Sequence, residues 1–228
     1  MKTIQIAIDG PSGSGKSTLA KNVARKLGIL YLDTGAMYRA CGLKALRLGL
    51  KPGSAEEVTP FLESLDLDIR FVDETQRIFL DGEDVSEAIR QPEVSVAASD
   101  ISAIPAVRTK LVQMQREIAG TRDVVLDGRD IGSHVLPDAP FKFFLTADPR
   151  ERAKRRLVEL KEKGINTQTY EEVLAGIVYR DQQDSTRAAS PLRKMPDAIE
   201  IDTTFNQPED TLAQLMSHIP AEYIHDKL

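Results

Sequence analysis

Short apolar runs alternate with amphipathic stretches along most of the chain, and this alternation predicts the fold. The run at residues 4–8 precedes a helical pattern over residues 16–27, and Gly28 follows as the left-handed residue that commonly ends a helix. Further apolar runs, each leading into a helical pattern, lie at residues 29–32, 124–126, 141–145 and 198–201. Strands that are apolar throughout are typical of parallel sheets covered on both faces. We therefore predict an α/β fold with a doubly wound, five-stranded parallel sheet.

The helices that follow these runs can be bounded from caps and glycines. One is expected from the strand end at Asp33 to about Leu48, and Pro105 opens another that stops at Gly120. After Pro149 a helix is expected to fade near residue 163, and Thr169 begins a helix of about twenty residues that ends near Pro191. A last helix follows the fifth strand.

Residues 49–90 have a different pattern. At residues 65–71 apolar and polar side chains alternate with period two, which is typical of a strand with one face in water. A second strand is expected around residues 77–80, and Asp81-Gly82 is a turn signal. We predict a small antiparallel meander, inserted into one domain that spans residues 1–228.

Composition excludes several classes of function. The 228 residues are 41% hydrophobic and 29% charged, with a formal net charge of -5, which argues against nonspecific binding to nucleic acid or to a membrane surface. Neither a secretory leader nor an eighteen-residue apolar span is visible, and Cys41 has no second cysteine to pair with. We expect a cytoplasmic protein and, because no exposed apolar interface is indicated, a monomer.

One loop carries the clearest chemistry. It lies between the first strand and the first helix and fits the spacing G-x-x-x-x-G-K-[ST] in full. Its glycines let backbone N–H groups converge on phosphate oxygens, and the helix N-terminus adds partial positive charge. Lys16 then meets the outer phosphates of a triphosphate, and the Ser17 hydroxyl is expected to bind Mg²⁺. The predicted triphosphate-binding residues, which the resemblance described below assigns to ATP, are Gly10, Pro11, Ser12, Gly13, Ser14, Gly15, Lys16, Ser17 and Thr18.

A second group of charges points to a second anion. Arg180, Asp184 and Arg187 have the spacing of one helix face, which by itself fits a solvated ion-pair ladder equally well. Arg129 and Asp130 favour the binding hypothesis, because they follow a strand at the edge where open α/β sheets hold ligands. Arginine matches phosphate oxygens with two parallel hydrogen bonds. Two facing anion sites indicate phosphoryl transfer between nucleotides.

Phosphoryl transfer to a nucleoside monophosphate does not require a general base in the protein. A sugar hydroxyl benefits from a base that takes its proton, whereas a monophosphate already carries an ionised oxygen at neutral pH. In-line positioning and charge neutralisation are then sufficient, and Lys16, Mg²⁺ and converging arginines can supply them.

These motifs together resemble the bacterial cytidylate kinases over essentially the whole chain. The resemblance rests on five segments in the family's order, namely the phosphate loop and residues 33–39, 81–85, 127–132 and 180–187. The Gly-Arg-Asp segment at residues 128–130, joined to the later arginine helix, is the more specific part. Some family members have Ser in place of Thr34 and Gly in place of Ser17, and both differences are mild because the hydroxyls present here can serve.

The resemblance implies a role for each site residue. The implied CMP-binding residues form three sets. The phosphate would be bound by Thr34, Arg39, Arg129 and Arg187, with Tyr38 beside them, and the ribose by Arg180 and Asp184. The base would be read by Ser99, Arg108 and Asp130. The catalytic cations are Lys16, Arg129 and Arg187, joined by Arg152, Arg155 and Arg156 of a lid at about residues 148–168. The insertion at about residues 49–90 belongs to the monophosphate region, and Asp127 lies near the metal without binding it directly.

The reaction predicted from these residues is ATP plus CMP or dCMP giving ADP plus CDP or dCDP, with Mg²⁺. A carboxylate at Asp130 can accept from the exocyclic amino group of cytosine, whereas uracil presents a carbonyl there. Two alternatives stay open at this point. One is another P-loop kinase of the adenylate, gluconate or shikimate type, and the other is a nucleotide-binding module that transfers nothing.

Overall fold

The computed structural model describes residues 3–72, 75–162, 164 and 168–223. The chain divides into two compact units, one of residues 1–29 with 123–228 and the other of residues 30–122. The predicted lid and insertion limits stay predictions, and residues 163 and 165–167 of the lid lie outside the described residues. Within the described ranges, no helix is long and apolar enough to cross a membrane.

A five-stranded sheet has the order β2-β6-β1-β7-β8. Its strands are β1 (Gln5–Asp9), β2 (Leu30–Asp33), β6 (Val124–Gly128), β7 (Phe141–Thr146) and β8 (Ile199–Asp202). In the first unit β1 pairs in parallel with both β6 and β7, and β7 pairs in parallel with β8. Ile6, Ile8 and Leu126 are fully buried, as expected of strands covered on both faces. The predicted α/β fold with five parallel strands is confirmed.

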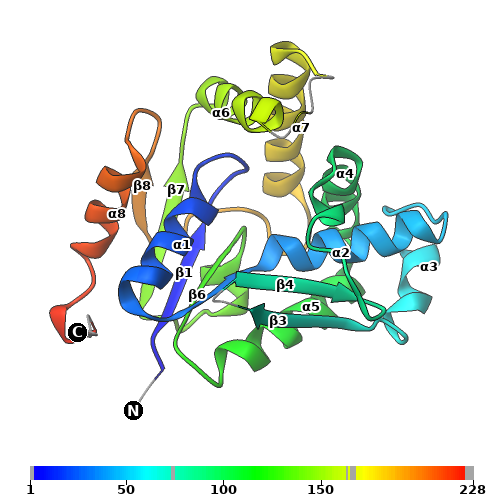
Figure 1. Cartoon of the computed structure of the whole chain (residues 1–228), viewed down its shortest axis with the longest axis horizontal. Coiled ribbons are helices and arrows are strands. Elements are labelled where there is room, and N and C mark those ends of the chain that lie inside the picture. Colours follow the sequence, from blue (N-terminus) through cyan, green and yellow to red (C-terminus); the bar gives the residue numbers. More distant parts are fainter. Residues whose placement is uncertain (1–2, 73–74, 163, 165–167, 224–228) are drawn as a thin grey trace. The chain divides into compact units, whose positions relative to one another are not determined.

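The helices of the first unit form two groups (Figure 1). One group is α1 (Lys16–Leu27) with α8 (Pro208–Met216), which pack side by side. The other is α6 (Pro149–Glu162) with α7 (Tyr170–Thr186), which pack against each other through a small core of their own. That core consists of Ala153, Leu160, Val173 and Ile177.

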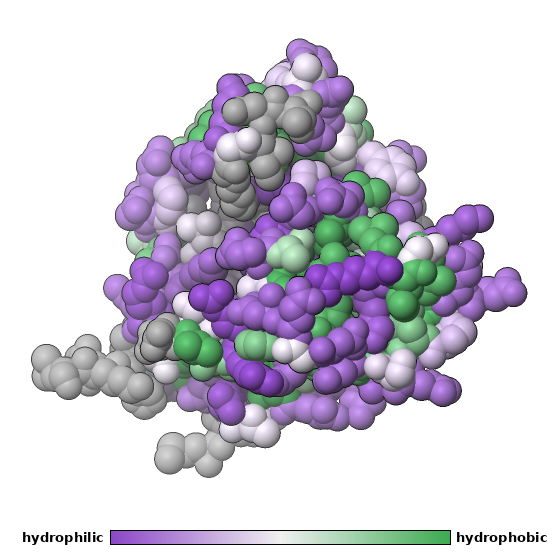
Figure 2. Space-filling view, turned by 45° about the vertical axis from the view of Figure 1, so that its right-hand side comes forward, coloured by the Kyte–Doolittle hydropathy of each residue, from purple (hydrophilic) through white to green (hydrophobic). Residues whose placement is uncertain are grey.

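The second unit combines helices with a small sheet. The sheet is antiparallel, in the order β3 (Leu67–Val72), β4 (Thr75–Leu80) and β5 (Glu83–Asp84), and confirms the predicted meander. Its helices are α2 (Thr34–Arg47), α3 (Ala55–Val58), α4 (Pro92–Ile101) and α5 (Pro105–Ala119). Hydrophilic residues separate the hydrophobic areas on the face seen in Figure 2.

Helix α4 was not among the predicted elements. Its buried residues, Val94, Ala97, Ala98 and Ile101, have helical spacing, but two of the four are alanines, so few large apolar side chains mark the helix in the sequence. The helix packs closely on α2, where a Cβ added to Gly42 would lie 3.0 Å from the backbone nitrogen of Ala98. Close backbone packing of small residues therefore stabilises a helix that the pattern of large apolar residues does not indicate.

The predicted end of the helix that begins at Thr169 was wrong. Helix α7 ends at Thr186, and Arg187 follows with an extended backbone (φ -59°, ψ 141°). Ser190 then adopts a left-handed conformation (φ 50°), and its carbonyl accepts from Arg187 Nε at 2.8 Å. Arg187 therefore does not continue the face of Arg180 and Asp184, and it reaches its partners from the segment after the helix.

Candidate active site

The phosphate loop between β1 and α1 has a conformation that its glycines make possible. Gly13 and Gly15 have positive φ angles of 76° and 86°. At Gly10 (φ 147°), an added Cβ would lie 2.1 Å from the carbonyl oxygen of Leu145 on β7. Only glycine fits there, because any side chain would collide with a backbone atom. The loop therefore turns into the N-terminus of α1 with its backbone exposed to an anion.

Lys16 is buried, and its Nζ donates to the carbonyl of Pro11 at 2.6 Å. Burial, together with the nearby Arg129 guanidinium, lowers the pKa of Lys16 from 10.5 to about 7, against the opposing effect of Asp127 and Asp184. Two cations close together in a desolvated setting repel each other, and an anion between them relieves that repulsion. The arrangement is suited to binding phosphate.

Ser17 lies at the first turn of α1 and faces the end of β6. Its Oγ donates to Asp127 Oδ2 at 2.7 Å, and Asp127 is buried. The pair offers a hydroxyl and a carboxylate, the oxygen ligands that Mg²⁺ prefers, so these residues fit the metal expected from the sequence. Over the part of the chain that is described, no group of three or more His, Cys, Asp or Glu could hold a metal ion.

An arginine–carboxylate network, formed by Arg129, Asp130, Asp184 and Arg187, joins β6 to the end of α7. Arg129 Nε donates to Asp184 Oδ2 at 2.7 Å, and Arg187 lies 4.0 Å from Asp184 Oδ1 and 3.5 Å from Asp130 Oδ1. Burial alone would raise the pKa of Asp184, but Arg129, Arg187 and Arg180 lower it below 3.8. The network brings together the predicted phosphate-binding residues Arg129 and Arg187 with Asp184 of the ribose set and Asp130 of the base-reading set.

In the second unit, Asp33 organises the start of α2. One carboxylate oxygen accepts from the backbone nitrogen of Ala36 at 2.9 Å and caps the helix, and the other binds Arg39 Nη2 at 2.8 Å and Arg90 Nη1 at 3.3 Å. Although burial raises the pKa of Asp33, the two arginines and the helix cap bring it below 3.8. Thr34, the first residue of α2, is buried.

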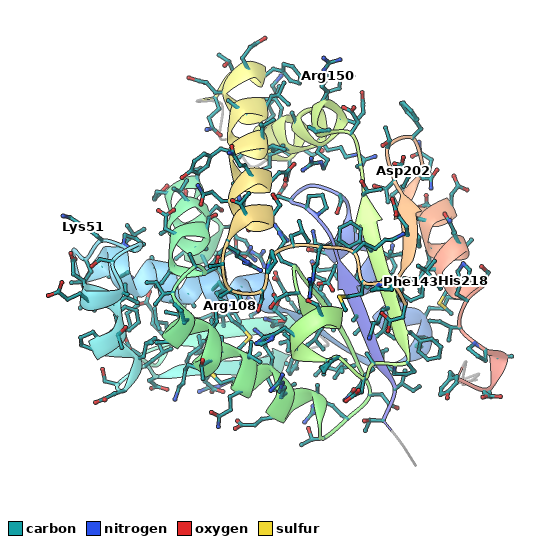
Figure 3. The ribbon with its side chains drawn as sticks, turned by 180° about the vertical axis from the view of Figure 1, so that it is seen from behind. Lys51, Arg108, Phe143, Arg150, Asp202 and His218 are labelled. Atoms are coloured by element: carbon teal, nitrogen blue, oxygen red, sulfur yellow. The ribbon has the colours of Figure 1, made fainter. Side chains whose placement is uncertain are left out.

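The base-reading candidates of the second unit lie on α4 and α5. Arg108 on α5, labelled in Figure 3, is buried and lies over the ring of Tyr38 at 5.8 Å. Its Nη1 donates to the carbonyl of Ser102 at 3.4 Å. Ser99 is half-buried on α4 and its carbonyl accepts from Ser102 Oγ. Tyr38, Ser102 and Arg108 thus form one contact group.

The three lid arginines of α6 have different surroundings. Arg152 is buried and donates to the Ser12 carbonyl of the phosphate loop at 3.0 Å and to both carboxylate oxygens of Asp181. Arg155 donates to the carbonyls of Thr203 and Thr204 after β8, whereas Arg156 pairs with Glu159 at 2.8 Å. Arg152 and Arg155 therefore connect α6 to the phosphate loop and to the loop after β8, and the role of each in phosphoryl transfer stays a prediction.

A cavity of about 490 Å³ opens beside the phosphate loop. It begins at Ser14 and Gly15, passes Thr18 and Leu19 on α1, and reaches the loop that follows Asp202 of β8, which Figure 3 labels. The remaining residues that line it are Arg155, Thr203, Thr204, Phe205, Asn206, Gln207, Pro208 and Thr211. Thr203 Oγ1 donates to the Ser14 carbonyl at 3.0 Å and joins this loop to the phosphate loop. A cavity of this volume can hold a small ligand.

Sequence reasoning did not single out this cavity or Asp33. The loop after β8 is polar and has no recognised spacing, so only its position beside the phosphate loop gives it importance. Asp33 did carry a signal, because an aspartate immediately before the first residue of a helix is a favourable N-cap. Its pairing with Arg90, which lies 57 residues further along the chain, needs the fold.

Together the parallel sheet and the phosphate loop define a P-loop protein. Among solved structures, an uncharacterized protein from Eubacterium ventriosum ATCC 27560 has a TM-score of 0.52 at 15% identity and covers 95% of this chain and 98% of its own. A gluconokinase from Sinorhizobium meliloti 1021 has a TM-score of 0.50 at 12% identity, covering 95% and 92%. Identities this low establish the fold alone.

Sequence comparison is more specific. The family model described as cytidylate kinase matches residues 6–221. A cytidylate kinase from Caldicellulosiruptor bescii is 53% identical over 216 residues, which are 95% of each chain. One from Clostridioides difficile (strain 630) is 48% identical over 96% of this chain and 99% of its own. The chain belongs to the cytidylate kinase family, as the resemblance had indicated.

Proposed function

We propose that this chain transfers the γ-phosphoryl group of ATP to the phosphate of CMP or dCMP and releases ADP and CDP or dCDP. Family membership supports the substrates. The structural observation that carries the proposal is that buried Lys16 lies near Arg129, which Asp184 holds at 2.7 Å. Burial and the Arg129 charge lower the pKa of Lys16 to about 7, and a phosphate bound beside Lys16 would favour its charged form. We place the reaction in the cytoplasm and assign it to a monomer, as expected from the sequence.

The donor nucleotide is assigned to the phosphate loop and the neighbouring cavity. The triphosphate would accept hydrogen bonds from the loop N–H groups and meet Lys16, and its base would enter the cavity of about 490 Å³. Phe205 lines this cavity and is 86% exposed, so its ring is available to stack on a planar base. Ser17 would bind Mg²⁺, with Asp127 accepting from the Ser17 hydroxyl.

The acceptor nucleotide is assigned to the CMP-binding residues that the family resemblance implies. Arg129 and Arg187 of the arginine–carboxylate network, with Thr34 and Arg39, would bind the CMP phosphate, and Arg180 and Asp184 the ribose. Ser99, Arg108 and Asp130 would read the base, and a carboxylate at Asp130 accepts from the cytosine amino group. UMP would present a carbonyl to that carboxylate, which leaves two acceptors facing each other.

The chemistry then needs positioning and charge rather than a proton acceptor. At neutral pH the CMP phosphate supplies an ionised oxygen, which attacks the γ-phosphorus as the bond to the ADP oxygen breaks. Lys16 and the arginines neutralise charge on the transferring oxygens, and Mg²⁺ when bound adds a further positive charge to them. Closure of the lid would exclude water, which could otherwise accept the phosphoryl group.

A coupled assay of ADP release tests the proposal. The protein is supplied with ATP and Mg²⁺ and, in separate reactions, with CMP, dCMP, UMP, AMP, GMP, gluconate and shikimate. We expect turnover with CMP and dCMP at least about tenfold above every other acceptor. Equal rates with UMP would contradict the role of Asp130, and turnover with gluconate or shikimate alone would contradict the proposed function.

A further inference from the structure

Asp9 is a buried carboxylate in the first unit to which the proposed mechanism gives no role. It is the last residue of β1, immediately before Gly10 of the phosphate loop. Its Oδ1 accepts from the backbone nitrogen of Ile131 at 2.7 Å, and its Oδ2 from that of Gly132 at 2.8 Å. These two amides directly follow Arg129 and Asp130. One side chain thus joins the strand before the phosphate loop to the segment that carries two predicted acceptor-binding residues.

The backbone that Asp9 holds is unusual. Ile131–Val135 forms one turn of π-helix, and Asp130 before it has φ -147° and ψ 29°, outside the helical and extended regions. The first amides of such a turn have no partner within it, so an acceptor must come from elsewhere. A carboxylate that accepts from two successive amides fixes both the position and the direction of the chain at this point.

Little space remains between Asp9 and Gly132 for a larger side chain. A Cβ added to Gly132 would lie 3.4 Å from Asp9 Oδ2 and 3.2 Å from Cδ of Lys142 on β7. The Lys142 ammonium donates to the Pro137 carbonyl and to Asp197, so it holds the far end of the same segment. Residues 130–137 are therefore attached at both ends, with Asp9 at the end nearer Arg129.

The environment of Asp9 disfavours its ionised form, yet both of its oxygens are hydrogen-bonded. Burial and, to a smaller extent, the nearby Asp130 raise the pKa of Asp9 to about 6, although the amides of Gly132 and Ile131 and the charge of Lys16 oppose the increase. A carboxylate that burial disfavours in this way is retained here with both oxygens bonded to backbone. Its contacts are with the segment after β6 rather than with the loop that binds the donor.

We propose that Asp9 is a positioning residue for phosphoryl transfer, which sets residues 129–132 so that Arg129 and Asp130 meet the acceptor nucleotide. This role rests on the proposed function, because it gives a purpose to residues assigned there. Both carboxylate oxygens of Asp9 are used by the amides of Ile131 and Gly132, so its loss should act through the acceptor site. The Michaelis constant for ATP should change little, while the specificity constant for CMP should fall.

The test is Asp9→Asn, with Asp123→Asn as its matched control. Asparagine keeps the size of the side chain but offers one acceptor, and its N–H group would face a backbone N–H. Asp123 Oδ1 accepts from the backbone nitrogen of Ile4 at 2.6 Å, a bond of the same kind at the other end of the β1–β6 pair. We expect Asp9→Asn to lower kcat/KM for CMP by about tenfold or more and to change KM for ATP by less than about twofold. Asp123→Asn should leave both constants within about twofold.

The role of Asp9 would be overturned if Asp9→Asn raised KM for ATP by the same factor by which it lowered kcat/KM for CMP, or if it changed neither constant. If Asp9→Asn does not fold, Asp9→Glu provides the second test, because it retains both acceptors but displaces them by one methylene. Asp9→Glu should weaken CMP binding by calorimetry without weakening ATP binding, and wild-type affinity for CMP would contradict the proposal. A wild-type protein that phosphorylates other acceptors but not CMP would instead overturn the proposed function and, with it, this role.

Discussion

The phosphate loop and the arginine–carboxylate network lie in the same unit but are built by different means. The loop uses backbone N–H groups, and its conformation depends on Gly10, Gly13 and Gly15 at positive φ. The network uses side chains from β6 and the end of α7, and each arginine is held by a carboxylate. Backbone sites are specified by short local sequence, whereas side-chain networks are specified by pairs distant in the chain. We therefore propose that the loop recognises the triphosphate and that the network selects the acceptor.

Loss of Arg129 should have the largest effect. Arg129→Ala removes a predicted acceptor contact and leaves Asp184 without its 2.7 Å bond. We expect kcat/KM for CMP to fall about 10³-fold, roughly 4 kcal/mol of transition-state stabilisation, with KM for ATP little changed. Arg47→Ala is the control, because Arg47 pairs with Glu83 on the exposed surface of the second unit. Near-normal turnover of Arg129→Ala would remove Arg129 from the site.

A methyl group at Gly10 should disrupt the loop through the backbone. The added Cβ would lie 2.1 Å from the Leu145 carbonyl oxygen, so the loop or β7 must move. We expect Gly10→Ala to lower the free energy of unfolding by about 3 kcal/mol, measured by urea denaturation. Gly49→Ala, at φ 69° with no atom within 4 Å, should cost only about 1 kcal/mol. Similar losses at both positions would show that contact with β7 is unimportant.

Phe205 should have a smaller effect, confined to the donor. Phe205→Ala removes the exposed ring that lines the cavity beside the phosphate loop. We expect KM for ATP to rise about tenfold, because base stacking on an aromatic ring contributes about 1–3 kcal/mol. The constants for CMP should be unchanged. Val178→Ala, an exposed apolar side chain on α7, is the control, and an unaltered KM for ATP in Phe205→Ala would place the base elsewhere.

The pH dependence of stability should show the smallest difference. The folded-state pKa of Asp184 lies below its ordinary value of 3.8, so its ionised form stabilises the fold above that pH. This stabilisation should be lost as the pH falls through the lower, folded-state value. We expect the free energy of unfolding to decrease below pH 3.8, and to decrease less steeply in Asp184→Asn. Identical pH profiles for the two proteins would mean that the network contributes no such stabilisation.

The same contrast explains what the sequence can predict. The extent of α1, expected from about Lys16 to Leu27, was confirmed, because its amphipathic pattern ends at Gly28, whose φ is 63°. The phosphate loop was predicted for the same reason, since its spacing is local. The partner of Arg129 lies 55 residues away, and Arg187 acts from beyond the helix to which its spacing assigned it. The spacing of charged residues alone indicates which arginines lie close together, but not which carboxylate or carbonyl pairs with each of them.

The donor cavity and Asp9 show a further limit of sequence reasoning. Residues 203–208 contain no charged side chain, and only contact with Ser14 identifies them as part of the site. Asp9 precedes the phosphate loop, but its hydrogen bonds reach residues 131 and 132 across the β1–β6 pair. Such roles arise from strand order, which the alternation of apolar and helical segments does not determine.

The most direct test of the account is a crystal structure of the protein with CMP bound. The account predicts that the CMP phosphate lies within hydrogen-bond distance of the guanidinium groups of Arg39, Arg129 and Arg187, with the cytosine amino group donating to Asp130. A CMP phosphate that contacts none of these three arginines would contradict it.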